Sequence, residues 1–221
     1  MQQISLLIFD LDGTLVDTLD DIAASVNHTL ERLGHDPIHR DTVRHYVGDG
    51  IETLMSRCLR GQVARLDEAV AIYKEHHARN LVRHSKLYPG VRETLEHFKP
   101  LPMAVVSNKA MAFVGPLLDR LAIGRYFTMV LGADLNVPLK PAPDALLRIM
   151  AYSNAAKELT VIVGDGTTDI LAGRAAGIIT CAATYGFRTE KELRLVRPDH
   201  VIHEFPDLKK LFTATTTSAT A

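Results

Sequence analysis

The order of hydrophobic and polar positions divides the chain into two kinds of region. Residues 6–9 are four consecutive hydrophobic residues, which is typical of a short strand buried on both faces. From about residue 17 to residue 85 no further strand is evident, and hydrophobic residues recur at helical spacing, most clearly over 18–33. Gly34 and Pro37 are expected to end this first helix. The pattern predicts a block of helices directly after the first strand.

Beyond residue 90, short hydrophobic runs alternate with amphipathic segments. We predict strands at 103–107, 128–131, 160–163, 178–182 and 200–202. Strands that alternate with helices are typical of a mostly parallel sheet with helices on both faces. The predicted fold class is therefore α/β, with a doubly wound, Rossmann-like parallel-sheet core and an inserted all-helical domain.

The domain organisation follows from these boundaries. The expected core comprises residues 1–16 and 86–212, and the helical insertion comprises residues 17–85. Residues 213–221 consist only of threonine, serine and alanine, and we expect them to form a disordered tail.

Charge and composition exclude several classes of protein. The 25 basic and 26 acidic residues nearly cancel, which argues against a nucleic-acid binder. Cys58 and Cys181 have no metal-binding spacing, and we expect both to be reduced thiols. No hydrophobic run approaches the roughly 18–20 residues of a membrane span, and no secretory signal is visible. We expect a cytoplasmic protein without a membrane or nucleic-acid partner, and the sequence leaves open whether it is a monomer or a homodimer.

Polar residues follow four of the predicted strands. Asp10 and Asp12 follow the first strand, and side chains two residues apart on an extended backbone point the same way. Like charges at such proximity repel each other, so this pair requires a cation or a proton. Ser107 and Asn108 end the second strand, and Lys140 lies in the loop after the third.

The fourth strand leads into Asp165 and Asp169. Ligands of open parallel sheets bind outside the carboxyl ends of the strands, where all these residues would meet. Carboxylates are ligands of Mg²⁺, and an ammonium group and hydroxyls suit phosphate oxygens. The set predicts a site that binds a divalent cation and a phosphate group together.

Two other interpretations of these segments fit less well. A calcium-binding EF-hand loop starting at Asp10 would need glycine where Leu15 stands. A dinucleotide-binding loop starting at Gly164 would need glycine where Asp169 stands.

Four segments together resemble the motifs of the haloacid dehalogenase-type phosphatases, in the order of that family. They are DLDGT at 10–14, VVSN at 105–108, KPAPD at 140–144 and GDGTTD at 164–169. The helical insertion is similar to the C1-type cap of the family. One departure is Gly166, because many relatives with this cap have serine or threonine after the aspartate of the last motif.

The resemblance implies a role for each acidic residue. Asp10 would attack phosphorus and form an aspartyl-phosphate, and Asp12 would act as general acid and then as general base. Mg²⁺ would be held by Asp10, the main-chain carbonyl of Asp12, Asp165 and Asp169.

The resemblance also implies the residues that bind the phosphoryl group. Ser107 and Lys140 would contact its oxygens, while Thr14 and Asn108 would support the site. Gly13 would bring its main-chain amide near the phosphate.

Within the family, the segments LDGTLVDTLDDIA, YVGDGIETL and SNK look most like those of phosphoglycolate phosphatases. The expected substrate is thus a small phosphorylated metabolite, 2-phosphoglycolate. Its carboxylate would meet the helix that begins near Ile51, or one of the side chains of His45, Arg57 and Arg83.

Other activities remain open at this point. Within the same fold these are a pyrophosphatase, a sugar-phosphate phosphatase or a phosphoglucomutase. A different class of protein, a non-enzymatic phosphate-binding or phospho-accepting signalling module, also remains open.

Overall fold

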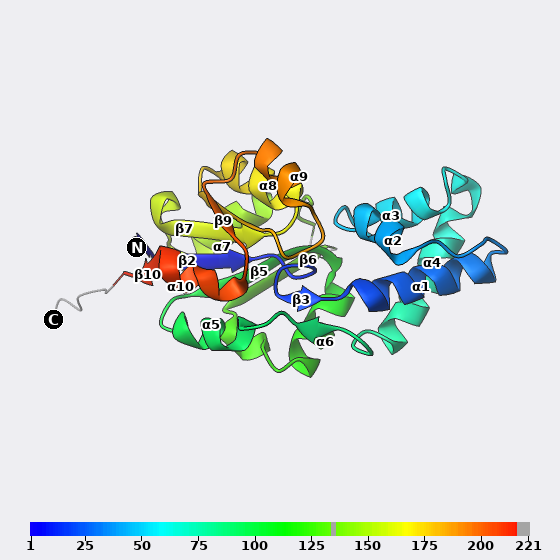
Figure 1. Ribbon diagram of the computed structural model, residues 1–221, viewed down its shortest axis with the longest axis horizontal. Helices are drawn as coiled ribbons and strands as arrows, with labels where there is room; N and C mark the ends of the chain where they lie inside the picture. The colour runs from blue at the N-terminus through cyan, green and yellow to red at the C-terminus, as the bar shows by residue number, and fades with distance from the viewer. Residues whose placement is uncertain (134–135, 216–221) are drawn as a thin grey trace.

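The computed structural model describes residues 1–133 and 136–215, and its centre is a parallel sheet of six strands in the order β6-β5-β2-β7-β8-β9 (Figure 1). All neighbouring strands in this sheet pair in parallel. The strands are β2 (Leu6–Phe9), β5 (Met103–Ala110), β6 (Met129–Ala133), β7 (Thr160–Gly164), β8 (Ile179–Ala183) and β9 (His200–Ile202). The predicted α/β class with a parallel sheet is confirmed, and β5 extends three residues beyond the predicted end at 107.

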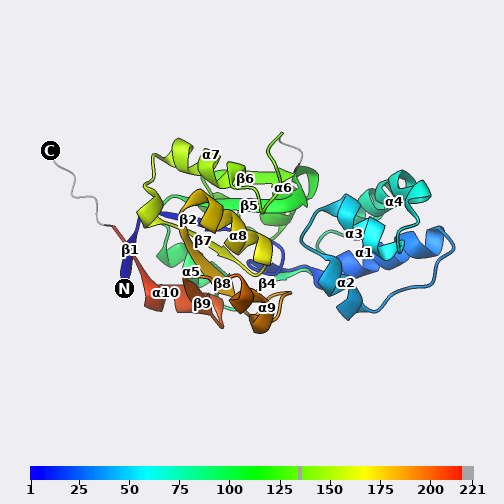
Figure 2. The ribbon, with the colours of Figure 1, turned by 90° about the horizontal axis from the view of Figure 1, so that it is seen from above.

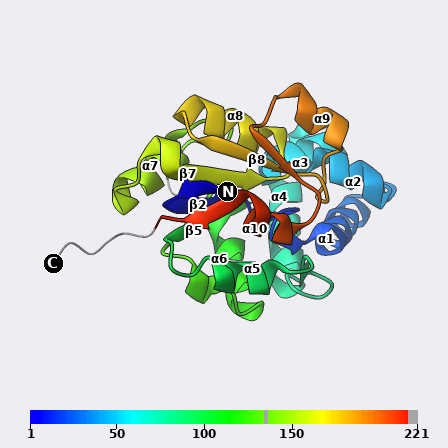
Figure 3. The ribbon, with the colours of Figure 1, turned by 60° about the vertical axis from the view of Figure 1, so that its left-hand side comes forward.

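Helices cover both faces of this sheet (Figure 3). They are α5 (Val91–His97), α6 (Met111–Arg120), α7 (Asp144–Ser153), α8 (Thr167–Ala176), α9 (Glu190–Leu195) and α10 (Leu208–Leu211). Leu6 and Ile8 pack in one hydrophobic cluster with residues of α7 and α8, whereas Leu7 and Phe9 pack in another with residues of α5 and α6. Because consecutive side chains of a strand point to opposite faces, β2 is hydrophobic throughout and lies at the centre of both layers.

Four further helices form a lobe beside the sheet (Figure 2). This helical lobe consists of α1 (Leu19–Arg32), α2 (Arg40–Tyr46), α3 (Ile51–Cys58) and α4 (Leu66–Arg79). The chain enters it through β3 (Val16–Asp17) and leaves it through β4 (Lys86–Leu87), and these two strands pair antiparallel. Short 3₁₀ helices occur at Val63–Arg65, Gly124–Tyr126, Lys157–Leu159 and Phe205–Asp207.

A buried carboxylate fixes the chain where it leaves the lobe. Asp21 on α1 accepts hydrogen bonds from the main-chain N–H groups of Arg83, His84 and Ser85, and from the Ser85 hydroxyl. Hydrogen bonds to an ionised acceptor are among the strongest in proteins. The two chain segments that join the lobe to the sheet are thereby tied to each other at the base of α1.

The end of the chain differs from the prediction. β10 (Phe212–Ala214) pairs in parallel with β1 (Gln2–Ile4), and the Thr215 N–H donates to the Ile4 carbonyl over 2.9 Å. The expectation of a disordered tail from residue 213 is therefore wrong for residues 213–215, because pairing across the whole chain satisfies their backbone groups. The rest of the predicted tail, residues 216–221, lies outside the described residues. Within the described part of the chain, no helix has the length and hydrophobicity required to cross a membrane.

Candidate active site

Three neighbouring strands bring the predicted site residues to one edge of the sheet. β2 lies between β5 and β7, and Phe9 is in register with Val105 on one side and with Val163 on the other. Asp10 follows β2, Asp165 follows β7, and Ser107 lies in the last part of β5. Because the strands are parallel, these side chains emerge together at the carboxyl edge, which faces the helical lobe.

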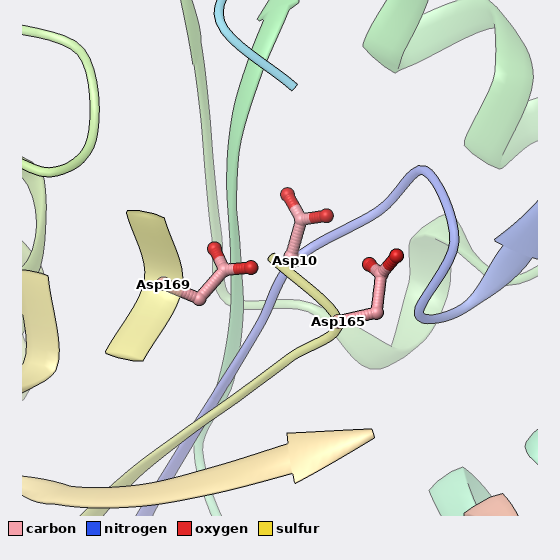
Figure 4. Close-up of side chains that lie close together, drawn as sticks. All are labelled: Asp10, Asp165 and Asp169. Atoms are coloured by element: carbon pink, nitrogen blue, oxygen red, sulfur yellow. The ribbon is translucent and has the colours of Figure 1, made fainter. Parts of the chain in front are cut away.

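Three carboxylates form a buried cluster at this edge. Ligand oxygens of Asp10, Asp165 and Asp169 lie within 4.8 Å of one another, and Figure 4 shows the three side chains side by side. Their residues are only 8%, 3% and 1% exposed. Such a cluster of oxygens fits a hard divalent cation, because the positive charge offsets both the burial and the mutual repulsion of the acids.

The pKa values of the cluster reflect this crowding. Burial raises the pKa of Asp10 well above its ordinary value, Lys140 opposes the shift, and Asp169 and Asp165 add to it. Burial, followed by repulsion from Asp169, raises the pKa of Asp165 to about 7. A bound cation would lower both pKa values, so the donor set fits a metal site and is electrostatically costly without one.

Gly13 and Thr14 support Asp165 and do not line the pocket. Thr14 donates to Asp165 Oδ1 over 2.8 Å and accepts from the main-chain N–H of Asp165 over 3.0 Å. Gly13 has φ +90°, and a Cβ atom there would overlap the Asp165 carboxylate. Its N–H donates to the Val16 carbonyl over 2.8 Å. The expectation that the Gly13 amide faces the phosphate is therefore wrong in this structure, since the tight turn uses that hydrogen.

Lys140 is held between two of the carboxylates. Its ammonium group donates to Asp10 Oδ1 and to Asp169 Oδ1, each over 2.6 Å, and to the Val106 carbonyl over 2.8 Å. Burial alone would lower its pKa, but attraction to Asp10 and Asp169 outweighs burial and raises it, so the side chain is a cation.

Asn108 joins Lys140 to the helical lobe. Its side-chain oxygen accepts from the Lys140 N–H, and its amide donates to the Lys140 carbonyl, both over 2.9 Å. The same amide group donates to the Gly48 carbonyl in the lobe over 2.9 Å. Asn108 therefore supports the position of Lys140 and also contacts the loop between α2 and α3.

Asp12 lies apart from the carboxylate cluster. Its Oδ1 accepts from the Thr18 hydroxyl over 2.6 Å and from the Lys109 ammonium over 3.2 Å. Neither Lys109 nor Thr18 was predicted from the sequence as a site residue. The only signal for Lys109 was a lysine next to the Ser-Asn pair at the end of a buried strand. The Ser107 hydroxyl accepts from the Lys109 N–H over 3.2 Å.

A pocket of about 840 Å³, which includes space open to solvent, separates the sheet edge from the helical lobe. On the sheet side it is lined by Asp10, Asp12, Ser107, Asn108, Lys109, Lys140, Asp165, Gly166, Thr167, Thr168, Asp169, Phe187 and Arg188. On the lobe side it is lined by Ile22, Val47, Gly48, Asp49, Gly50, Ile51, Leu54 and Tyr73. Both threonines after Gly166 thus face the space in which a ligand would lie.

The side chains expected to meet a substrate carboxylate from the lobe are elsewhere. Arg57 pairs with Asp49 over 2.6 Å, and His45 and Arg83 are exposed; none of the three lines the pocket. The start of α3 at Ile51 does line it, as expected.

A residue of the sheet domain that the sequence analysis missed, Arg188, contacts the lobe instead. Its guanidinium donates to the carbonyls of Arg44 over 3.1 Å and Val47 over 2.8 Å. Together with Asn108, it holds the α2–α3 loop against the edge of the sheet.

Comparison with known proteins agrees with this geometry. A model of the haloacid dehalogenase-like hydrolases matches residues 7–183. The chain is 37% identical over 212 residues to a phosphoglycolate phosphatase of Pseudomonas putida, covering 90% of this chain and 76% of that protein. It is 35% identical over 218 residues to a phosphoglycolate phosphatase of Colwellia psychrerythraea, covering 94% and 96% respectively.

Solved structures give the same result. The crystal structure of a predicted phosphoglycolate phosphatase from Haemophilus somnus has a TM-score of 0.90 at 29% identity, covering 96% of this chain and 99% of that chain. A haloacid dehalogenase-like hydrolase from Streptococcus pneumoniae has a TM-score of 0.87 at 26% identity, covering 96% and 99%. With all four motifs gathered at one edge of the sheet and a family model that spans most of its length, the chain belongs to the haloacid dehalogenase-like hydrolases.

Proposed function

We propose that this hydrolase is a Mg²⁺-dependent phosphomonoesterase that works through an aspartyl-phosphate on Asp10 and acts on 2-phosphoglycolate. The observation that carries the proposal is the buried cluster of Asp10, Asp165 and Asp169 beside the cation of Lys140. Three acids buried together destabilise the fold unless a cation binds to them. Such a cluster therefore indicates a site for a cation and a phosphate.

Asp10 suits the role of nucleophile. Lys140 holds its Oδ1, so the carboxylate is oriented and the other oxygen is free to attack phosphorus. All three hydrogen bonds of the Lys140 ammonium go to Asp10, Asp169 and the Val106 carbonyl, which favours a role in orienting Asp10 and balancing charge. The Ser107 hydroxyl, which accepts from the Lys109 N–H, can donate its own hydrogen to a phosphoryl oxygen.

Asp12 suits the role of general acid and base. Thr18 and Lys109 both bind its Oδ1, which leaves Oδ2 for the proton that passes to the leaving oxygen and is later taken from water. Asp10 and Asp12 would therefore have different roles: the Asp10 carboxylate forms the bond to phosphorus, and the Asp12 carboxylate transfers the proton.

Asp10, Asp165 and Asp169, with the main-chain carbonyl of Asp12, would hold the Mg²⁺. When bound, the ion would neutralise the acids and the phosphate oxygens and so stabilise the charge that develops during transfer. The charged side chains that line the pocket also favour a bound divalent cation. With all five aspartates of the pocket ionised, as in the metal-bound state, its three basic residues leave an excess of two negative charges, which a divalent cation would offset.

The substrate assignment rests on relatives and on the pocket. Two relatives at 37% and 35% identity carry the name phosphoglycolate phosphatase. We further propose that the helical lobe, residues 17–85, is a cap that closes over the core formed by residues 1–16 and the chain from 86 onward. Closure would exclude water from a small ligand bound at the sheet edge.

The test is a turnover assay over a panel of small phosphorylated metabolites, in Mg²⁺ and in EDTA. We expect hydrolysis only with Mg²⁺ and the highest kcat/KM for 2-phosphoglycolate. Asp10→Asn should abolish turnover while the variant stays folded, and Asp36→Asn, at an exposed loop position, is the matched control. Full activity of Asp10→Asn would refute the nucleophile assignment, and stoichiometric phosphorylation without turnover would favour a phospho-accepting signalling module.

A further inference from the structure

Three basic side chains line the pocket, and they differ in how many acceptors they already have. Lys140 donates to three acceptors. Both terminal nitrogens of Arg188 donate to main-chain carbonyls of the helical lobe. Lys109 donates only to Asp12 among the residues that the structure describes. Of the two ammonium groups, only that of Lys109 has donors unused by the described residues, two of its three, while the guanidinium of Arg188 is held against the lobe by both terminal nitrogens.

Lys109 is also the cation whose burial most needs a second partner. Its side chain is 5% exposed, and the single ion pair to Asp12 is 3.2 Å long. A buried ammonium group has three donors, and each unsatisfied donor costs free energy. Because Thr18 shares the same Asp12 oxygen, this carboxylate does not by itself satisfy the lysine. A second anion beside Lys109 would complete the arrangement.

The position of Lys109 relative to Asp12 specifies where that anion would be. Asp12 would protonate the ester oxygen of the substrate, so this oxygen lies beside the Asp12 carboxylate during the reaction. In an ester of a 2-hydroxy acid, one carbon atom separates the ester oxygen from the carboxylate carbon. A cation next to Asp12 therefore lies next to the substrate's carboxylate.

We propose that Lys109 binds the carboxylate of the substrate and thereby selects small phosphate esters that carry a carboxylate one carbon from the ester oxygen. This inference rests on the proposed function and names the residue that would set its specificity. It assigns to the sheet domain a contact that the sequence analysis expected from the helical lobe.

Hydrophobic side chains on the lobe side of the pocket strengthen this interaction. Ile22, Leu54 and the buried Tyr73 line the lobe side of the pocket and keep the local dielectric low. His77 stacks on Tyr73 with ring centroids 5.1 Å apart, and burial together with Lys109 lowers its pKa to about 2. This imidazole is therefore neutral and adds no second cation that could replace the lysine.

The test compares two esters of nearly equal shape, 2-phosphoglycolate and its amide, carbamoylmethyl phosphate. Lys109→Met should lower kcat/KM for 2-phosphoglycolate on the order of 10- to 100-fold, the usual value of a hydrogen bond between charged groups. The loss for the uncharged amide reports the contact of Lys109 with Asp12, so the loss for 2-phosphoglycolate should exceed the loss for the amide by at least about tenfold. Lys109→Arg should retain more of the preference for the carboxylate than Lys109→Met.

Equal losses for both esters would overturn the proposal and leave Lys109 as a residue that only positions Asp12. Lys191→Met, at an exposed position, is the control and should change neither value. If Lys109→Met does not fold, the wild-type protein gives the answer through inhibition. 3-Phosphonopropionate should then inhibit at least tenfold more strongly than propylphosphonate, and equal inhibition would refute the carboxylate contact.

Failure of the proposed function would look different. Wild-type protein that hydrolyses no phosphate ester in Mg²⁺ contradicts the phosphatase assignment itself. Wild-type protein that hydrolyses other esters but neither of these two contradicts the substrate assignment. Only an active wild-type protein in which Lys109→Met affects both esters alike isolates an error in the role of Lys109.

Discussion

The carboxylate cluster should make the metal-free protein less stable as the pH rises, and Asp165→Asn should remove much of this effect. Burial and Asp169 raise the pKa of Asp165 from its ordinary value of 3.8 to about 7 in the folded state. Between these two values the folded protein holds a proton that the unfolded chain has released. The free energy of unfolding therefore falls as the pH rises from about 4 to about 7.

The size of the effect follows from the shift. About three pKa units correspond to an upper limit of about 4 kcal/mol, at 1.36 kcal/mol per unit. In the Asn variant the side-chain oxygen can still accept from the Phe187 N–H, and its NH₂ can donate to the Thr14 hydroxyl, which reverses the bond that Thr14 donates to Asp165. The substitution therefore removes the charge and leaves the side chain with two hydrogen-bond partners.

The assay is urea unfolding in EDTA at several pH values between 4 and 8, with the free energy extrapolated to water. We expect the Asn variant to gain stability relative to wild type as the pH rises, by several kcal/mol at pH 8. The difference between the two proteins is the quantity to follow, because His77 gives both of them the same opposite pH dependence and its effect cancels. Saturating Mg²⁺ should stabilise wild type more than the variant.

Two results would refute this reasoning. A difference in the free energy of unfolding that stays constant from pH 4 to 8 would mean that folding does not raise the pKa of Asp165. A variant that is less stable than wild type at pH 8 in EDTA would mean that the charge itself stabilises the fold. Asp36→Asn should leave the pH dependence as it is in wild type.

Three further predictions concern other parts of the site. Gly13→Ala should lower Mg²⁺ affinity and cost roughly 1–3 kcal/mol of stability, because its φ is +90° and a Cβ would overlap Asp165; calorimetric titration that shows wild-type affinity would contradict this. Arg188→Met removes two hydrogen bonds to the helical lobe and should raise KM roughly tenfold with a smaller change in kcat, and steady-state kinetics with an unchanged KM would argue against lobe docking. The pKa of His77 falls from 6.5 to about 2 on folding, so the free energy of unfolding of wild type relative to that of His77→Phe should fall as the pH drops below about 6.5, and a difference that stays constant with pH in urea unfolding would exclude this role.

Local sequence was sufficient for the elements of the fold and for the core of the site. The strand at 6–9 is hydrophobic throughout because β2 is buried on both faces, and this composition is visible without a structure. Parallel strands also end at one edge, so the residues after them could be expected to meet. Asp10 and Lys140 lie 130 positions apart in the chain, yet their ion pair follows from that rule.

The structure corrected expectations where backbone hydrogen bonds decide the outcome. The tail was predicted from composition, but Phe212–Ala214 pairs with the other end of the chain. The Gly13 amide was expected to face the phosphate, but its hydrogen closes a turn onto Val16. The partner of a backbone N–H or carbonyl cannot be read from residue type, because almost every residue supplies the same backbone groups.

The sequence by itself determined the kind of chemistry, because that depends on which residue types follow which strands. Only the tertiary structure decided which side chains share an acceptor and which still have a free donor. The pairing of Lys109 with Asp12 joins residues 97 positions apart. Arg188 donates to the main-chain carbonyls of Arg44 and Val47, which are 144 and 141 positions away in the chain. Because every residue has a main-chain carbonyl, the sequence cannot identify these two as the acceptors. Specificity and closure of the pocket depend on such distances between side chains and on their burial, and these exist only once the chain has packed.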